Sequence, residues 1–336
     1  MVSSKRVPRI LKQALVGSLL FAFSSGSFAL HVSDLLNSMS AADRKLNYEG
    51  IFVLRKADRL LSMRVSHAAD ESGVREILET LNGEPRRVIR NNDEVMSVYP
   101  ERRLVVISED AGKSRLHPRL PENFDSLQRY YAISRLPEDR IADHAAAVLQ
   151  LTPRDEHRYG YRYWVDADTG VLLRCDLTNG DDAVIEQMMF TQLRYTDTPV
   201  SPDEVRPALD DYVRKNLSRN RSKLEQLEWR VNNLPPGFVL TQSSRQQEEN
   251  ADITHLVYSD GLASVSVFIE PGQGSRRYLS GGSNMGALNA YGVRHGDFYV
   301  TVMGEVPANT VQQIALSTEY LGGEDADDDP EPEIGD

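Results

Sequence analysis

Between Tyr48 and Tyr195 the chain consists almost entirely of short apolar runs separated by turn signals. Asn82-Gly83, Asn91-Asn92-Asp93 and Asn179-Gly180 mark three of the turns, because Asn, Asp and Gly tolerate the backbone conformations that tight reversals need. Regularly spaced short strands joined in this way predict an antiparallel meander. The expected strands are 48–55, 60–66, 74–81, 86–90, 94–99, 104–108, 130–136, 147–151, 159–165, 171–177 and 184–191.

One hairpin of this meander can be aligned from the sequence. The two-residue period of a strand places Tyr161 and Tyr163 on one face, and residues 166–170 form the turn. Cys175, the only cysteine, is then expected on the buried face among tyrosines, as an inert thiol. The predicted pairs are Val165 with Val171, Tyr163 with Leu173, Tyr161 with Cys175, and Tyr159 with Leu177.

Several strands have apolar residues on both faces. Phe52 points one way and Ile51 and Val53 the other, whereas a meander normally exposes one face to water. This pattern predicts a sheet covered on both sides, curved around helices, with a second domain or a ligand against the remaining surface. A plain core without a ligand explains the same pattern equally well.

The first 29 residues resemble a cleavable secretory signal. Lys5, Arg6, Arg9 and Lys12 precede a short apolar run, and small residues lead to Ala29. The run is too short to span a bilayer, so a retained anchor is the weaker alternative. The mature chain is expected to begin near Leu30, outside the cytoplasm, with a short helix carrying Val32, Leu35, Leu36 and Met39 on one face and Ser33 as its cap.

The rest of the chain predicts a second module. A connector over 201–228, helical and charged from about Leu209, leads to a module over 229–322 that starts at Trp229. Its expected strands are 239–242, 254–259, 263–270, 287–294 and 298–305, with a glycine-rich loop over 271–286. A closing helix carries Val311, Ile314, Ala315 and Thr318 on one face, with Asn309 as its cap and Gly322 at its end. Residues 323–336 hold eight acidic residues and are expected to be disordered.

No catalytic motif is present. Gly281-Gly282-Ser283-Asn284-Met285 lacks the final glycine of a nucleophile elbow, no His pair has zinc-site spacing, and the loop after Asp166 lacks the glycine and acid of a calcium loop. The formal net charge of −12 argues against nucleic acid as a partner. We therefore expect no enzyme, metal or cofactor, and the oligomeric state stays open, a homo-oligomer included.

The chain resembles the MucB/RseB family of periplasmic sigma-factor regulators. The matching segments are LNYEGIFVLR, YGYRYWVDADTGVLLRCDL, IEQMMFTQLRYTD, LPPGFVL, YSDGLASVSVFIEP, SNMGALNAYGVRHGDFYVTVMGEVP and the closing helix. They span nearly all of the chain after the signal, and the acidic tail lies outside the usual pattern.

The resemblance implies an α+β fold. The first domain, over 30–200, is expected to be an open, mostly antiparallel half-barrel of the lipoprotein-carrier type, wrapped around helices. The second is a small antiparallel sheet with a packed C-terminal helix. The resemblance also implies binding to the periplasmic part of a transmembrane anti-sigma factor, protection of that segment from proteolysis, and release by a lipid or lipopolysaccharide signal.

Two sets of candidate residues follow from this interpretation, although each is equally explicable as core or as a plain surface turn. The lipid-cavity candidates are Phe52, Leu54, Met63, Met96, Val98, Met188 and Phe190. The partner-binding candidates are Tyr258, Ser259, Asp260, Gly261, Arg276, Arg277 and Met285, with the 272–286 loop and the region after Thr196. The alternatives are a periplasmic lipid or lipoprotein carrier, which would not need the second module, and a hydrolase with an unfamiliar site.

Overall fold

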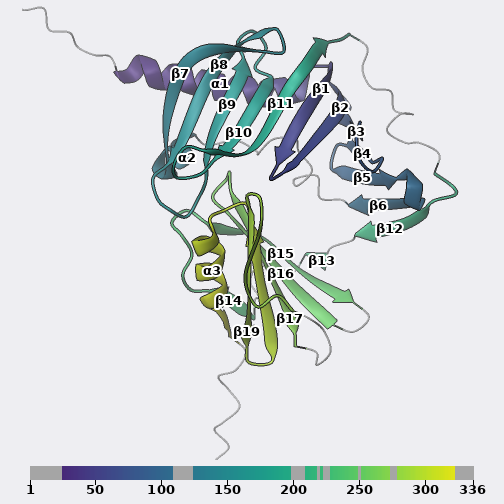
Figure 1. Cartoon of the computed structure of the whole chain (residues 1–336), viewed down its shortest axis with the longest axis vertical. Helices are drawn as coiled ribbons and strands as arrows, with labels where there is room; N and C mark the ends of the chain where they lie inside the picture. Colours follow the sequence, from purple (N-terminus) through teal and green to yellow (C-terminus); the bar gives the residue numbers. More distant parts are fainter. Residues whose placement is uncertain are drawn as a thin grey trace, which may run out of the picture.

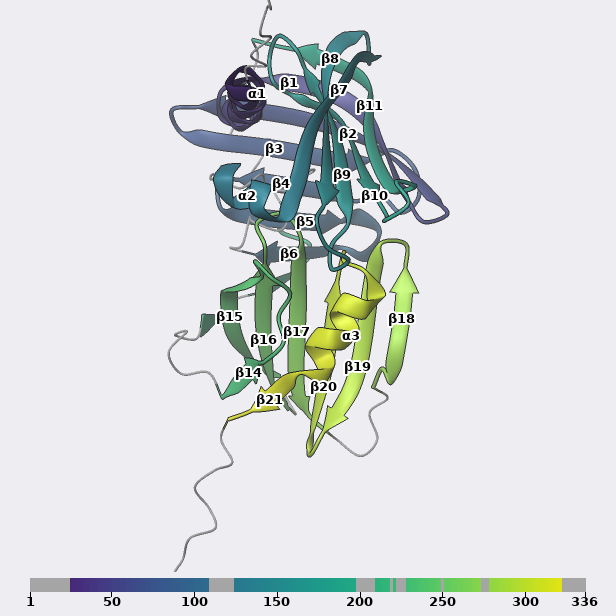
Figure 2. The ribbon, with the colours of Figure 1, turned by 90° about the vertical axis from the view of Figure 1, so that its left-hand side faces the viewer.

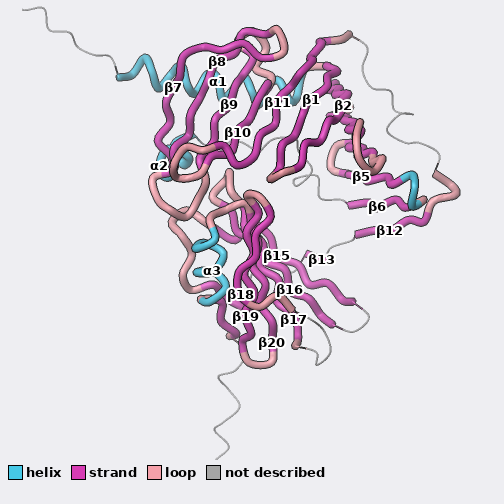
Figure 3. Tube along the Cα trace, viewed as in Figure 1, coloured by secondary structure: helices cyan, strands magenta, loops and turns pink. Residues whose placement is uncertain are grey.

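The computed structural model describes residues 25–108, 124–197, 209–217, 220–221, 228–248, 251–272 and 278–321. Figure 1 shows two sheets, one above the other, and Figure 3 shows that strands dominate both. The first is a twelve-stranded sheet with the order β12-β6-β5-β4-β3-β2-β1-β11-β10-β9-β8-β7. Its two terminal strands do not pair with each other, so the sheet is open.

The strands of the first sheet follow the predicted meander. Every neighbouring pair is antiparallel except β12 with β6, which run parallel. The bounds are β1 Tyr48–Lys56, β2 Arg59–Asp70, β3 Gly73–Thr80, β4 Arg87–Asn91, β5 Glu94–Tyr99, β6 Leu104–Ser108, β7 Tyr131–Ile141, β8 His144–Pro153, β9 Gly160–Asp166, β10 Leu172–Thr178, β11 Val184–Tyr195 and β12 Val213–Leu217.

Helix α1 (Ser25–Lys45) lies across one face of this sheet and is seen end-on in Figure 2. Its side chains Val32, Met39 and Ala42 are buried, because they repeat at helical spacing and so share one face. The short helix α2 (Phe124–Tyr130) leads into β7, and η1 (Pro100–Arg102) joins β5 to β6. The main core forms between α1, α2 and the sheet.

The second sheet is smaller and packs one helix. Its order is β13-β15-β16-β17-β20-β19-β18, and helix α3 (Ala308–Leu316) buries Val311 and Ile314 against it. A separate two-stranded pair, β14 (Trp229–Val231) with β21 (Thr318–Tyr320), closes this unit. The remaining bounds are β13 Asn220–Arg221, β15 Val239–Glu248, β16 Ala251–Ser259, β17 Ser264–Pro271, β18 Gly281–Met285, β19 Leu288–His295 and β20 Phe298–Gly304.

This architecture confirms the predicted fold class: mostly antiparallel strands, an open sheet around helices, and a small sheet with a C-terminal helix. The expectation of apolar burial on both faces is confirmed at β9, where Tyr163 and Trp164 point to opposite faces and are 1% and 5% exposed. Trp164 is covered by the Arg174 guanidinium, 4.0 Å from the ring centroid, and its indole N–H donates to Asp139. At β1 the second face is only half-buried, at Ile51 and Val53.

The hairpin prediction was correct in its faces and wrong in its register. Tyr163 pairs with Cys175, and Tyr161 with Leu177, which is two residues from the predicted alignment. The turn begins one residue later on the first strand than predicted, because the Asp166 N–H donates to the Val171 carbonyl. An irregularity between Leu172 and Arg174 adds the second residue of the shift. A shift of two residues preserves the buried face.

Two segments predicted as non-strand form strands. The connector prediction of a helix from Leu209 was wrong, because 213–217 pair as β12 with β6 and 220–221 pair as β13 with β15. Within the predicted glycine-rich loop, 281–285 form β18, because the two-residue turn Gly286-Ala287 folds them onto β19. Pairing available in the tertiary structure overrides local composition here.

The predicted helix ends were also wrong. Helix α1 starts before Ser33, which is therefore not its cap. Helix α3 has Pro307 at its N-cap and Asn309 inside its first turn, and it ends at Leu316, so that Thr318 belongs to β21. Gly322, the acidic tail and residues 1–24 lie outside the described residues.

Candidate functional site

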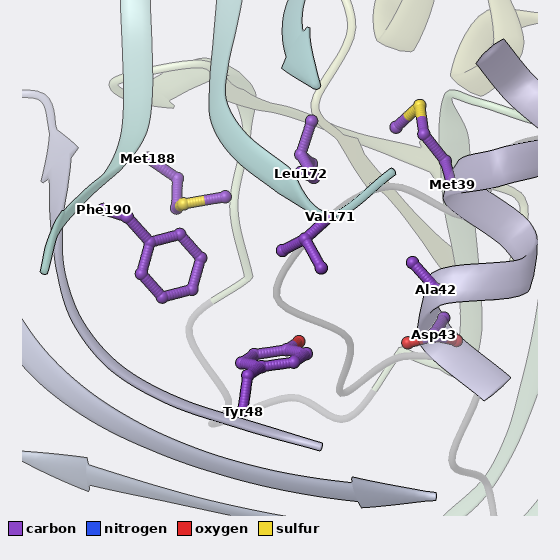
Figure 4. Close-up of a pocket in the computed structure, with 8 residues that line it drawn as sticks. All are labelled: Met39, Ala42, Asp43, Tyr48, Val171, Leu172, Met188 and Phe190. Atoms are coloured by element: carbon purple, nitrogen blue, oxygen red, sulfur yellow. The ribbon is translucent and has the colours of Figure 1, made fainter. Parts of the chain in front are cut away.

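A small cavity lies between α1 and the sheet (Figure 4). Its volume is about 20 Å³, which is room for about one water molecule. The lining comes from elements far apart in the chain, namely α1 and the strands β1, β11 and β10, which are neighbours in the sheet beneath α1. The lining residues are Met39, Ala42, Asp43, Tyr48, Val171, Leu172, Met188 and Phe190.

Local periodicity explains why these side chains converge. Met39, Ala42 and Asp43 are three and four residues apart on α1 and therefore share one helix face. Met188 and Phe190 alternate on β11 and therefore share one sheet face. The cavity thus lies between side chains on one face of α1 and side chains on the facing side of β11.

Aromatic rings form one wall of the cavity. Phe190 contacts Phe52 edge-on with centroids 5.8 Å apart, and it contacts Tyr48 edge-on at 6.3 Å. Tyr48 in turn stacks on His67 at 4.7 Å. Burial, reinforced by the Glu76 and Asp43 carboxylates, raises the pKa of Tyr48 well above its ordinary value. The phenol is therefore neutral at physiological pH, and this wall is uncharged.

One side of the cavity is polar. The His67 ring is 1% exposed, its Nδ1 lies 3.0 Å from the Leu46 carbonyl oxygen, and its Nε2 lies 3.8 Å from Asp43 Oδ1. Asp43 is itself a lining residue at the C-terminal end of α1. The cavity therefore combines an apolar lining with one acidic edge.

The structure brings some of the predicted cavity residues together. Met188 and Phe190 line the cavity, Phe52 contacts Phe190, and Leu54 and Met63 are half-buried against the same core. Met96 and Val98 lie elsewhere, in a separate cluster with Val105 and Leu209. Sequence reasoning missed Asp43, Tyr48, Val171, Leu172 and Ala42 as lining residues, although Met39 was already on the predicted apolar stripe of α1.

A second polar centre joins the two sheets. Arg158, in the β8–β9 connection, and Asp260, after β16, form an ion pair with an N–O distance of 2.5 Å, and neither side chain is exposed. The Tyr131 hydroxyl donates to the same Asp260 oxygen at 3.1 Å. Arg158 also donates to Asp155 and, at 2.6 Å, to the Pro236 carbonyl. We refer to these five residues as the interdomain clamp.

Further contacts extend this seam. Thr310 Oγ1 donates to the His157 carbonyl at 3.0 Å, and Asn289 Nδ2 donates to the Tyr159 hydroxyl at 3.0 Å. Lys56 on β1 lies 3.0 Å from both Glu186 of the first sheet and Glu305 of the second. The two sheets are therefore held together by specific hydrogen bonds.

The predicted partner-binding residues are dispersed. Tyr258 is buried in the core of the second sheet, and the Ser259 hydroxyl accepts the Gly261 N–H within its own turn. Asp260 serves the interdomain clamp and also accepts the Leu262 and Ala263 N–H groups. Met285 is 66% exposed on β18. Arg276 and Arg277 lie outside the described residues.

The single thiol, Cys175, lies outside these centres and is buried. Burial raises the pKa of the Cys175 thiol far above its ordinary value, so the thiol form persists. No cluster of three or more potential metal ligands occurs in the described part of the chain. A helix both long and apolar enough to cross a bilayer is likewise absent from the described residues.

Comparison with known proteins places both parts of the chain in one family. Residues 31–209 match the MucB/RseB N-terminal domain and residues 223–319 the MucB/RseB C-terminal domain. The chain is 32% identical over 310 residues to the Sigma factor AlgU regulatory protein MucB of Pseudomonas aeruginosa, covering 90% of this chain and 95% of that protein. It is 27% identical over 323 residues to the Sigma-E factor regulatory protein RseB of Haemophilus influenzae, covering 94% and 99%.

Solved structures agree with these matches. A complex of Pseudomonas aeruginosa MucA and MucB superimposes with a TM-score of 0.68 at 30% identity, covering 86% of this chain and 99% of that one. A crystal structure of MucB with MucA(peri) gives a TM-score of 0.65 at 29% identity, covering 86% and 98%. Similarity over both sheets and most of the sequence shows that this chain belongs to the MucB/RseB family.

Proposed function

We propose that this protein is a periplasmic negative regulator of an envelope-stress sigma factor. It binds the periplasmic segment of a transmembrane anti-sigma factor and shields that segment from regulated proteolysis. The observation that carries this proposal is the similarity, across both sheets, to MucB structures that contain MucA. The named relatives are regulatory proteins of sigma factors, and the proposal extends their role to this chain as a binding protein rather than an enzyme.

The physical basis of shielding is loss of accessible conformations. A flexible segment that becomes ordered on binding no longer samples the conformations that a protease requires. Release needs only a ligand with different affinities for the free and partner-bound states. A tenfold weakening corresponds to about 1.4 kcal/mol of differential affinity.

A lipid signal would act at the cavity under α1. Because the cavity holds only about one water molecule, an acyl chain requires α1 to move away from Met188 and Phe190. The apolar lining and the Asp43 edge support a ligand with an apolar chain and a polar head. The lipid role of Phe52, Leu54, Met63, Met96 and Val98 stays a prediction.

Export is the second element of the proposal. The charged, apolar and small-residue order of 1–29 supports a cleavable signal and a periplasmic location, with domains over 30–200 and 229–322. N-terminal sequencing of the protein recovered from periplasm is expected to start near Leu30. Recovery of the uncleaved chain from membranes would contradict the signal assignment.

A binding experiment tests the partner. The full-length protein is titrated with the purified periplasmic fragment of the MucA homologue of the same organism. The proposal expects saturable binding and slower cleavage of the fragment by the first protease of the cascade. Truncation at Trp229 is a poor variant, because it removes Asp260 and the Pro236 carbonyl from Arg158 and exposes a surface that the intact protein buries. Absence of binding by the intact protein would overturn the proposal.

A periplasmic lipid or lipoprotein carrier is the second candidate, favoured by the open sheet with an apolar cavity. Native mass spectrometry after gentle purification separates the two. Stoichiometric bound lipid favours the carrier, and an empty protein that binds the MucA homologue favours the regulator.

A further inference from the structure

The strand β18 forms an uncovered edge of the second sheet. It is the last strand in the sheet order and pairs only with β19, and Figure 2 shows its outer side free among the described elements. Residues 282–285 are exposed. A Cβ added to Gly281 would meet no described atom within 4 Å, so the sheet face is open at this position.

The hairpin geometry identifies which backbone groups point outward. Met285 and Leu288 flank the two-residue turn Gly286-Ala287, so they form a hydrogen-bonded pair, and pairs alternate from there without a bulge. Gly282 and Asn284 therefore belong to non-hydrogen-bonded pairs with β19. Their N–H and C=O groups point away from β19, toward the open edge.

Both edges of the first sheet are protected. The edge strand β7 contains Pro137, a charged run from Glu138 to Arg140, and an irregularity between Leu136 and Asp139. The edge strand β12 carries Arg214 and Lys215. These are the devices that natural sheets use against unwanted pairing. Strand β18, with the sequence GGSNM, contains no charge, proline or bulge.

We propose that the outer edge of β18 receives an extended segment of the anti-sigma partner as an added antiparallel or parallel strand. This inference rests on the function proposed above and names the surface that would perform it. Strand addition engages the main chain of the incoming segment, and side-chain positions on alternate faces supply specificity. Met285, 66% exposed, provides an apolar contact on one of those faces.

The composition of β18 favours a different chain over a second copy of this one. Gly281 and Gly282 place no side chain beside an incoming strand, so an incoming segment with bulky residues can fill that space. Two copies of β18 would set glycines of both chains along the shared edge and bury little apolar surface. Main-chain capture also explains shielding, because a main chain held in the sheet is withdrawn from a protease that needs it extended and free.

Amide hydrogen exchange on the full-length protein tests the register directly. In the free protein the Gly282 and Asn284 amides should exchange at least tenfold faster than those of Ser283 and Met285. Addition of the purified periplasmic fragment of the MucA homologue should slow Gly282 and Asn284 at least tenfold. If the fragment binds and both amides stay fast, the inference is wrong. If the fragment does not bind at all, the proposed function fails instead.

Two variants at one position distinguish recognition through the main chain from recognition through the side chain. Asn284→Pro removes an outward N–H on the side where an edge strand tolerates proline, and Asn284→Ala keeps it. Asn284→Pro should weaken fragment binding about tenfold or more, and Asn284→Ala should leave binding within twofold of the wild type. Equal weakening by both variants would contradict main-chain recognition. If the Gly282 and Asn284 amides become protected as the protein concentration rises, without the fragment, a second copy of the protein occupies the edge. This result would also overturn the inference.

Discussion

Arg158 and Asp260 are 102 residues apart in sequence and form an ion pair in which neither side chain is exposed. The pair connects the β8–β9 segment of the first sheet to the turn after β16 of the second. It is surrounded by the aromatic rings of Tyr130, Tyr131 and Phe238, each centroid within 4.9 to 5.7 Å of the guanidinium carbon. A charge in such a setting needs its partner, because it cannot be solvated by water.

Removing one member of this pair is expected to destabilise the protein strongly. Asp260→Ala should lower the free energy of unfolding by about 3 kcal/mol, at the lower end for buried pairs because Asp155 and the Pro236 carbonyl still accept from Arg158. The double variant Arg158→Met/Asp260→Leu should recover much of the loss, since no buried charge remains. Urea unfolding measures both variants, and a loss below about 1 kcal/mol for Asp260→Ala would contradict the role of the pair.

The contact between α1 and the turn before β10 can be tested by substitution of a glycine. Gly170 has φ +82°, and an added Cβ would lie 2.6 Å from the Ser38 backbone on α1. Gly83 has a similar φ, +76°, but an added Cβ would meet nothing within 4 Å. Both substitutions to Ala carry the left-handed strain, about 1 to 2 kcal/mol, but only Gly170→Ala adds the clash.

The difference in unfolding free energy between these two variants therefore measures the contact with α1 alone. Gly170→Ala should lose about 1 to 3 kcal/mol more unfolding free energy than Gly83→Ala. Thermal or urea unfolding of the two variants side by side supplies the comparison. Equal losses would mean that α1 is not held against this turn in solution.

Buried tyrosines make the protein sensitive to alkaline pH. Burial raises the pKa of Tyr161 and Tyr163 well above the ordinary value, and it raises the pKa of Tyr258 to about 12. A raised folded-state pKa contributes stability that is fully present below the unfolded value, near pH 10, and is lost as the pH rises through the folded value. Stability should therefore fall above about pH 10.

Absorbance at 295 nm against pH measures this ionisation, together with unfolding at each pH. The buried phenols should ionise only as the protein unfolds. Tyr258→Phe should show a shallower loss of stability between pH 10 and about 12, since one contributing group is gone. Full, reversible ionisation of all fourteen tyrosines with the fold intact would contradict the prediction.

The single thiol should behave as a core residue. Because burial keeps Cys175 protonated and unexposed, a thiol reagent should modify it only at the rate at which the protein opens. The labelling rate should rise with urea in parallel with unfolding. Rapid stoichiometric labelling of the native protein would show that the sheet around Tyr163 opens locally.

Many strands of the first sheet were predictable, because residues close together in the sequence specify them. The sequence predicted β5 and β6 with their observed ends, and it predicted the buried face of β9 and β10, because alternation and turn residues act over a few positions. The register of that hairpin was not predictable, since an irregularity at Leu172 to Arg174 leaves no pattern in composition. Strand β12 was missed because its exposed Val213 and charged neighbours pair with β6 only in the tertiary structure.

The candidate sites, like the fold, were predictable from the sequence only in part. Met188 and Phe190 were predicted as cavity residues from the interpretation that the family resemblance implies, but Asp43 and Tyr48 joined them only when α1 was placed over the sheet. No local signal connects Arg158 to Asp260, because each side chain is solvated alone and buried only when the two sheets meet. The sequence by itself determined the strand pattern, the faces and the family. The tertiary structure decided register, the cavity under α1 and the clamp between the sheets, since these depend on contacts between segments that the chain order leaves far apart.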